Sequence, residues 1–200
     1  MNSELLALHG VVVKKAAEAG EVARILGLPE EEVTKALDAA VASGDAMGAR
    51  GKYMATPQGR QRLDAAYPEE FAQLRQDDGF VGAWQRFERI NRDLKQLMTD
   101  WQTKTVGGEP VPNDHDDPDY DAGIIDRLGE LHERVEPILG QLAESVPRLD
   151  VYRQRLEAAY DRALAGETDY VSGVRVDSYH TVWFELHEDL LRMLGREREE

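Results

Sequence analysis

Apolar residues recur every three or four positions along four separate stretches of this chain, at residues 87–101, 124–142, 149–163 and 179–193. This spacing places one apolar stripe along each of four helices. Because such a stripe must be buried against another element, we predict that the four helices pack as an antiparallel bundle. We also expect Pro137 to kink the second helix, since proline removes a backbone hydrogen bond and clashes with the preceding turn.

The first 66 residues follow a different pattern, in which glycine and proline separate short elements. Gly27 is suited to the end of a helix, and Pro29 is suited to the start of the next one. Residues 46–55 contain two short extended segments about a glycine-bearing turn, which predicts a small β-hairpin. Thr56 and Pro57 then suit the N-cap and the first position of a further helix.

The first residues of the chain complete the order of elements. Leu5, Leu6 and Leu8 suit an opening helix, and the run from Val11 to Val13 suggests a short strand. Helix, strand, helix, turn, helix, hairpin and helix is the order of a winged helix-turn-helix. We therefore predict a mainly α protein, with a winged helix-turn-helix domain over residues 1–66, a linker or connecting helix over 67–79, and an acidic antiparallel helical bundle domain over 80–200.

The acidic charge of the chain is concentrated in the second of these domains. The net charge is -15, yet residues 1–66 hold eight Lys or Arg against nine Asp or Glu, and the remainder holds sixteen against thirty. Nucleic-acid binders usually present a basic surface, because neutralising phosphates supplies much of their affinity. Residues 1–66 are nearly neutral, so nucleic-acid binding is expected in this part of the chain rather than in the acidic remainder.

Composition excludes several classes of protein. The chain has no cysteine, which excludes disulfides and thiolate metal sites. It shows no basic segment followed by an apolar run at its start, as a signal peptide would. No stretch approaches the roughly 18 consecutive apolar residues that a membrane helix needs. We expect a cytoplasmic protein that does not associate with membranes.

Two segments resemble a known family: LGLPEEEVTKALDAAVASGD and YMATPQGRQRL. They resemble the winged helix of MarR-type transcriptional regulators, in which an LGL turn precedes the recognition helix and a TP-x-GR sequence follows the wing. The resemblance covers about a quarter of the chain and implies a homodimer that binds DNA. The later segments TDWQ, PNDHDDPDYD and DSYHTVWFELHEDLLRMLG resemble the helical C-terminal region of certain actinobacterial winged-helix proteins.

The resemblance implies a DNA-binding surface made by the recognition helix and the wing. Thr34 and Lys35 would approach base edges, and four basic residues would hold phosphates: Arg50, Lys52, Arg60 and Arg62. The sequence departs from the family pattern in the first turn of the recognition helix, which carries three glutamates, residues 30–32. These carboxylates suit the positive end of the helix dipole, but they would repel phosphates.

Aromatic and histidine residues of the helical part form a second candidate site. A ligand pocket between helices would be lined by Trp101, His132, His180, Trp183 and His187. Plain core packing explains the same residues, because aromatic side chains at helical spacing usually face a core.

Metal binding has weaker support in the sequence. His180 and His187 share a helix face, but about 10 Å of rise separates them, which is too far for one ion. The acidic segment around His115 lies in the long connection 104–120, which we expect to be a loop, as we do the connection 166–178. This segment lacks the spacing and the glycine of an EF-hand loop. Its oxygen-rich residues 113–117 could still hold a hard cation such as calcium or magnesium, and His115 or His132 could form a composite site with Asp114, Asp116 or Glu188. We nevertheless predict no metal site and no cofactor, because ligand types without the spacing are weak support.

The chain offers no phosphate-binding glycine loop, nucleophile-elbow serine or catalytic cysteine, so we do not expect an enzyme. The leading hypothesis is a winged-helix transcriptional regulator whose helical domain dimerises or senses a small-molecule effector. Two alternatives remain open, because a fold does not fix a function. One is an interaction or accessory module for a partner enzyme that does not bind DNA. The other is a helical protein that binds a small molecule.

Overall fold

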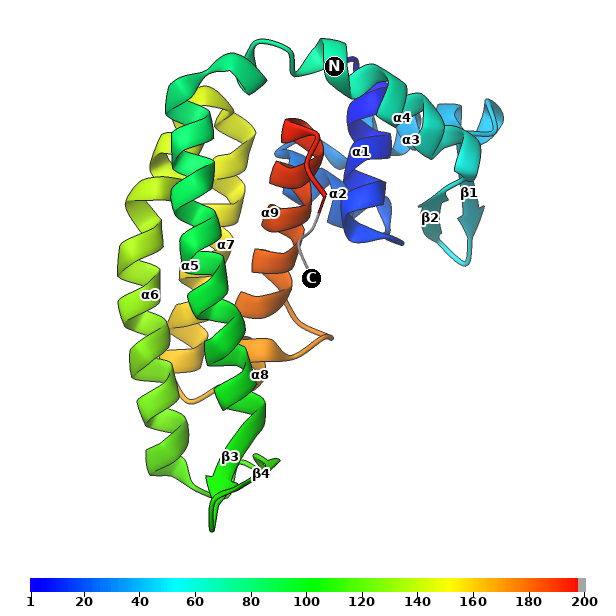
Figure 1. Ribbon diagram of the computed structural model, residues 1–200. Coiled ribbons are helices and arrows are strands. Elements are labelled where there is room, and N and C mark those ends of the chain that lie inside the picture. Colours follow the sequence, from blue (N-terminus) through cyan, green and yellow to red (C-terminus); the bar gives the residue numbers. More distant parts are fainter. Residues whose placement is uncertain (198–200) are drawn as a thin grey trace. The chain divides into compact units, whose positions relative to one another are not determined.

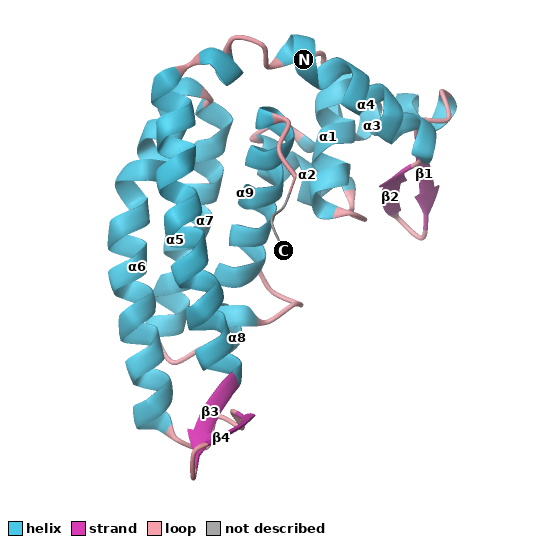
Figure 2. Ribbon diagram, in the orientation of Figure 1, coloured by secondary structure: helices cyan, strands magenta, loops and turns pink. Residues whose placement is uncertain are grey.

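The structure, a computed structural model, describes residues 1–197, which are mainly helical (Figures 1 and 2). The chain forms two compact units. The first contains Met1–Asp78, Val146–Val151 and the residues from Glu185 on, and the second contains Gly79–Ser145 and Tyr152–Phe184. The sequence placed residues 80–200 in one domain, whereas the structure groups two segments of that range with the N-terminal residues.

Three helices that pack against one another begin the first unit: α1 (Ser3–Lys14), α2 (Ala19–Leu26) and α3 (Glu30–Ala42). Asn2 caps α1 by accepting a hydrogen bond from the Leu5 amide at 2.9 Å. Gly27 ends α2 in the left-handed conformation, as the sequence predicted. Pro29 lies just before α3 as its N-cap, one position earlier than the predicted first helical residue.

Residues 11–13 are helical, so the predicted strand at this position is wrong. They lie inside α1, within a run of buried residues from Ala7 to Val13. Burial of this apolar run against α2 and α3 outweighs the modest preference of valine for extended backbone.

A β-hairpin follows α3, as predicted. Its strands are β1 (Ala46–Ala49) and β2 (Lys52–Ala55), and the turn residues Arg50 and Gly51 have φ of 54° and 78°. Positive φ at both positions is typical of the turns that match the twist of a hairpin. Ala17 adds a short bridge to β2, with hydrogen bonds of 3.1 and 2.8 Å to Tyr53.

Thr56 caps α4 (Pro57–Glu70) as predicted, by accepting a hydrogen bond from the Gly59 amide at 3.1 Å. This helix continues past Pro68 and occupies the start of the predicted linker 67–79. A 3-10 turn (Leu74–Gln76) follows before the next helix begins at Asp78. The linker is thus short, and most of its predicted length has regular structure.

The four apolar stripes are confirmed as helices: α5 (Asp78–Gln102), α6 (Pro118–Ser145), α7 (Asp150–Leu164) and α9 (Tyr179–Leu194). In the second unit α5, α6 and α7 run along one another (Figure 1). Ion pairs Arg134–Asp93 and Arg127–Asp100 join α5 and α6 at 2.5 and 2.7 Å. A 3-10 turn (Pro147–Leu149) precedes α7, and the short α8 (Asp169–Ser172) lies within the connection predicted as a loop. Pro137 lies inside α6, which continues across it.

The connection 104–120 was predicted as a loop, but residues 103–112 form a second β-hairpin. Strands β3 (Thr103–Val106) and β4 (Glu109–Pro112) pair antiparallel around Gly107 and Gly108, whose φ values are 62° and 91°. Proline is tolerated here because a two-stranded hairpin consists of edge strands. Among residues 1–197 we find no helix that combines the length and the hydropathy of a membrane span.

Candidate functional site

The exposed face of α3 holds the residues predicted to meet base edges. The helix buries Val33, Ala36, Leu37 and Ala40 against the first unit, which leaves Lys35 exposed and Thr34 half-buried on the other side. An open depression on this face is lined by Glu30, Glu31, Thr34, Lys35 and Asp38. The Thr34 hydroxyl donates to the Glu30 carbonyl at 2.9 Å, so its oxygen remains available as an acceptor.

Four of the predicted phosphate or base contacts are exposed cations: Lys35 on α3, Arg50 and Lys52 at the hairpin, and Arg60 on α4. None of the four forms an ion pair with any residue that the structure describes. Their charges are therefore available to an external anion.

Arg62 has a different environment from the other predicted phosphate contacts. Its guanidinium pairs with Glu4 and with Asp45, and the Asp45 side chain is buried. Burial alone would raise the pKa of Asp45, but hydrogen bonds from Arg62, Ser43 and Gln58 lower it below its usual value. Arg62 thus compensates a buried carboxylate inside the first unit.

The three glutamates that begin α3 do not share one orientation. Glu32 accepts a hydrogen bond from the Ser3 hydroxyl at 3.1 Å. The Glu30 carboxylate lies against Gly20 at the start of α2, where a Cβ atom would come within 3.1 Å of it. Glu31 is exposed. All three carboxylates were expected to repel phosphates. Two of them, Glu30 and Glu32, contact neighbouring helices.

The predicted ligand-binding residues fall into different contact groups, although His132 and Trp183 both contact the ring of Tyr179. In the second unit, the Trp183 indole donates to Asn91 at 3.0 Å and stacks on Phe87. Trp101 packs against the ring of His115, which follows the second hairpin. Both tryptophans therefore have the contacts of core residues, which agrees with plain core packing, the alternative to a ligand pocket.

The histidines of this predicted set are also separate. His132 lies 3.2 Å from the Tyr179 hydroxyl and stacks on Tyr160, and burial lowers its pKa. His180 is half-buried in the second unit, whereas His187 is buried in the part of α9 that belongs to the first. Among residues 1–197 no three His, Asp or Glu side chains come together in an arrangement that could hold a metal ion.

A buried polar cluster in the first unit was not predicted from the sequence. His9 on α1 lies with Nδ1 2.8 Å from the Tyr67 hydroxyl and Nε2 2.8 Å from Asp189 on α9. Arg148 donates to the same carboxylate at 2.8 Å. Lys14 and Glu185, both largely buried, form a further ion pair at 2.7 Å. These contacts tie α1, α4, α9 and the segment around Arg148 together.

Electrostatics assign the protons of this cluster. Burial alone would raise the pKa of Asp189, but Arg148 and His9 lower it far below its usual value. Burial lowers the pKa of His9 below 6.5 despite the attraction of Asp189. In neutral His9 the shorter contact to Asp189 assigns the proton to Nε2, which donates to the carboxylate, while Nδ1 accepts from Tyr67; the 3.3 Å approach of Arg148 to Nε2 is then not a hydrogen bond. Burial raises the pKa of Tyr67, which keeps the phenol protonated as this donor.

Comparison of the chain with protein-family models, with curated protein sequences and with solved structures found no match.

Proposed function

We propose that the first unit is a winged helix-turn-helix that binds DNA through α3 and the β1–β2 hairpin. The order of elements supports this proposal: α1, α2, α3 and a hairpin, with Ala17 between the first two helices pairing to β2. The one-residue bridge at Ala17 corresponds to the short strand that this fold places after its first helix. The two segments that resemble MarR-type regulators cover α3, the second strand of the hairpin and the start of α4.

One observation carries the proposed function. Lys35, Arg50, Lys52 and Arg60 have no ion-pair partner among the described residues, in a chain with 39 acidic and 24 basic residues. Other exposed cations, such as Arg89 and Arg92 on α5, are also unpaired within the described part of the chain, so what distinguishes these four is their position on α3, the hairpin and α4. Unpaired cations on the recognition helix, at the wing and at the start of the next helix are what phosphate contacts require.

The test is binding of mixed genomic DNA, followed by fluorescence anisotropy from low to moderate salt. We expect the logarithm of affinity to fall linearly with the logarithm of salt concentration. The variant Arg50→Asn with Lys52→Gln should bind more weakly and lower the slope by about one for each phosphate that is no longer neutralised. Asparagine is chosen because position 50 has φ of 54°, a conformation that asparagine tolerates.

The control is Arg175→Gln, which changes the net charge by the same amount per residue at an exposed position of the second unit. It should leave DNA affinity and the salt slope unchanged. Glu31→Gln should strengthen binding, because it removes one of the three exposed carboxylates at the α3 N-terminus, in the depression that Thr34 and Lys35 also line. Absence of binding at the lowest salt would refute the DNA-binding role and favour a module for protein contacts.

The family resemblance also leads us to propose that the protein acts as a homodimer, since dimers match two-fold symmetric DNA sites. Sedimentation equilibrium at micromolar concentration tests this directly. A monomer under those conditions, with and without DNA, would contradict it.

A further inference from the structure

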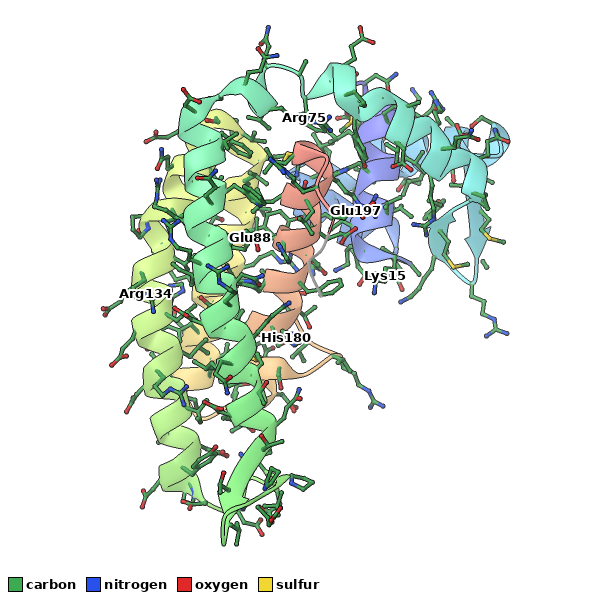
Figure 3. The ribbon with its side chains drawn as sticks, in the orientation of Figure 1. Lys15, Arg75, Glu88, Arg134, His180 and Glu197 are labelled. Carbon is green, nitrogen blue, oxygen red and sulfur yellow. The ribbon has the colours of Figure 1, made fainter. Side chains whose placement is uncertain are left out.

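A cavity of about 490 Å³ lies within the first unit, apart from α3 and the hairpin. Residues from α4, from the segment after it and from the last part of α9 line it: Asp64, Tyr67, Pro68, Arg75, Glu188, Leu191, Arg192, Gly195, Arg196 and Glu197. Figure 3 labels Arg75, which precedes α5, and Glu197, which lies in the segment after α9. The volume falls within the range of small-molecule sites.

Arg75 is fixed at one side of this cavity. Its Nε donates to the Met193 carbonyl at 2.8 Å, and its guanidinium lies against Gly195, where a Cβ atom would come within 3.0 Å of Cζ. The terminal nitrogens have no hydrogen-bond or ion-pair partner among the described residues. These two nitrogens are coplanar donors of a guanidinium whose orientation is fixed, and their geometry fits a carboxylate.

The cavity also holds two carboxylates without a cation. Asp64 and Glu197 form no ion pair with any described residue. By contrast, Glu188 is neutralised by Arg192 at 2.5 Å, and Arg196 has an interaction of its own. The charges that remain unpaired are therefore one guanidinium and two carboxylates.

The remaining wall of the cavity is suited to the aliphatic chain of a ligand. Tyr67, Pro68 and Leu191 supply apolar surface, and Tyr67 is held in place by its hydrogen bond to His9. The Nε atom of Arg192 is buried and has no hydrogen-bond partner among the described residues. A buried donor of this kind is stabilised when a ligand supplies an acceptor.

We propose that this cavity binds an α-amino acid with a basic side chain. The ligand carboxylate would pair with the Arg75 fork, and its two ammonium or guanidinium groups would pair with Asp64 and Glu197. The aliphatic stem would cover Leu191 and Tyr67. The same carboxylates would repel a phosphorylated or dicarboxylic ligand, which carries negative charge at both ends.

Isothermal titration calorimetry of the full chain tests the proposal, with L-lysine and L-arginine as probes. We expect saturable one-to-one binding of at least one of them. L-glutamate, inorganic phosphate and cadaverine, which is lysine without its carboxylate, should bind at least about tenfold more weakly, since each loses a charge-assisted contact or gains a repulsive one.

Two variants and two controls locate the site. Asp64→Asn and Arg75→Gln should each weaken binding by about tenfold or more. Asp116→Asn and Arg175→Gln make the same changes at exposed positions of the second unit and should have no effect. Asp64 is exposed on α4, so its variant should keep the fold even where Arg75→Gln weakens the end of α9.

The proposal is overturned if neither basic amino acid binds, if cadaverine or glutamate binds as tightly as lysine, or if Asp64→Asn leaves affinity unchanged. The titration contains no DNA. Its result is therefore independent of whether α3 and the hairpin contact DNA.

Discussion

The Nε2 atom of His9 lies 2.8 Å from the Oδ1 atom of Asp189, although 180 positions of sequence separate the two residues. Both side chains are almost fully buried, and Arg148 supplies the cation of the cluster. A buried carboxylate is tolerated only when it is paired and hydrogen-bonded. The stability of the first unit thus depends on residues from both ends of the chain.

Replacing Asp189 with asparagine should destabilise the protein by about 3–5 kcal/mol, because it leaves Arg148 beside a neutral partner in a buried site. The free energy of unfolding, from urea denaturation, measures this loss. Glu130→Gln, at an exposed position of α6, should change it by less than about 0.5 kcal/mol. Equal effects of the two variants would show that the cluster contributes nothing specific.

Acidification should destabilise the protein below about pH 6.5. Burial lowers the pKa of His9 below its ordinary value of 6.5, so the unfolded chain binds a proton in a pH range where the folded protein does not. The free energy of unfolding then falls as pH decreases through this range, with a slope of at most about 1.4 kcal/mol per pH unit for each such histidine.

Urea midpoints between pH 5 and 8 test this dependence. His9→Gln should flatten the pH profile, whatever its effect on stability at pH 8. His132→Gln should flatten it further, because burial lowers the pKa of His132 as well. An unchanged slope in His9→Gln would mean that His9 is not kept neutral by burial.

Arg60 and Arg62 should have opposite phenotypes although they are two positions apart. Arg62→Gln leaves the buried Asp45 without its cation and should lower the free energy of unfolding by about 1–3 kcal/mol. Arg60→Gln should change stability by less than about 0.5 kcal/mol and weaken DNA binding. Parallel denaturation and anisotropy measurements distinguish the two roles, and an Arg62→Gln protein of unchanged stability would contradict this assignment.

Gly59→Ala should disrupt the start of α4. A Cβ atom at this position would lie 2.0 Å from the carbonyl oxygen of Asp45, which belongs to the backbone and cannot rotate away. We expect a loss of about 1–3 kcal/mol, as for other overpacked sites. Gly123→Ala on α6, where no atom outside the adjacent helix backbone lies within 4 Å of the added carbon, should instead raise stability by up to about 1 kcal/mol. Melting temperatures of the two variants should therefore move in opposite directions.

Local elements of this fold could be predicted from the sequence because their causes are local. Gly27 and Thr56 end and begin helices through their own backbone and side-chain chemistry, and the hairpin at residues 46–55 depends on its own turn. The helical state of residues 11–13 depends on burial against α2 and α3, which local preference does not reveal. The hairpin at Gly107 was missed because Pro110 and Pro112 suggested a loop.

The candidate sites were predicted less completely, because they depend on contacts between distant positions. The neighbouring sequence does not distinguish Arg62 from Arg60, yet only Arg62 forms an ion pair with Asp45. His9 carried a signal, since it is a lone imidazole within an apolar run, and a buried histidine needs a hydrogen-bond partner. Its partner Asp189 could not be identified without the fold. Arg75 gave no signal, because its place in a cavity depends on the end of α9.

The assignment of residues from Glu185 on to the first unit has a consequence for the order of events during synthesis. A growing chain folds its domains as units, usually from the N-terminus. Here the ribosome must add 180 residues after His9 before Asp189 can reach it. Until then the apolar run of α1 can already pack against α2 and α3, but His9 has neither Asp189 nor Arg148 beside it, so the polar cluster of the first unit is completed only after α9 has been made.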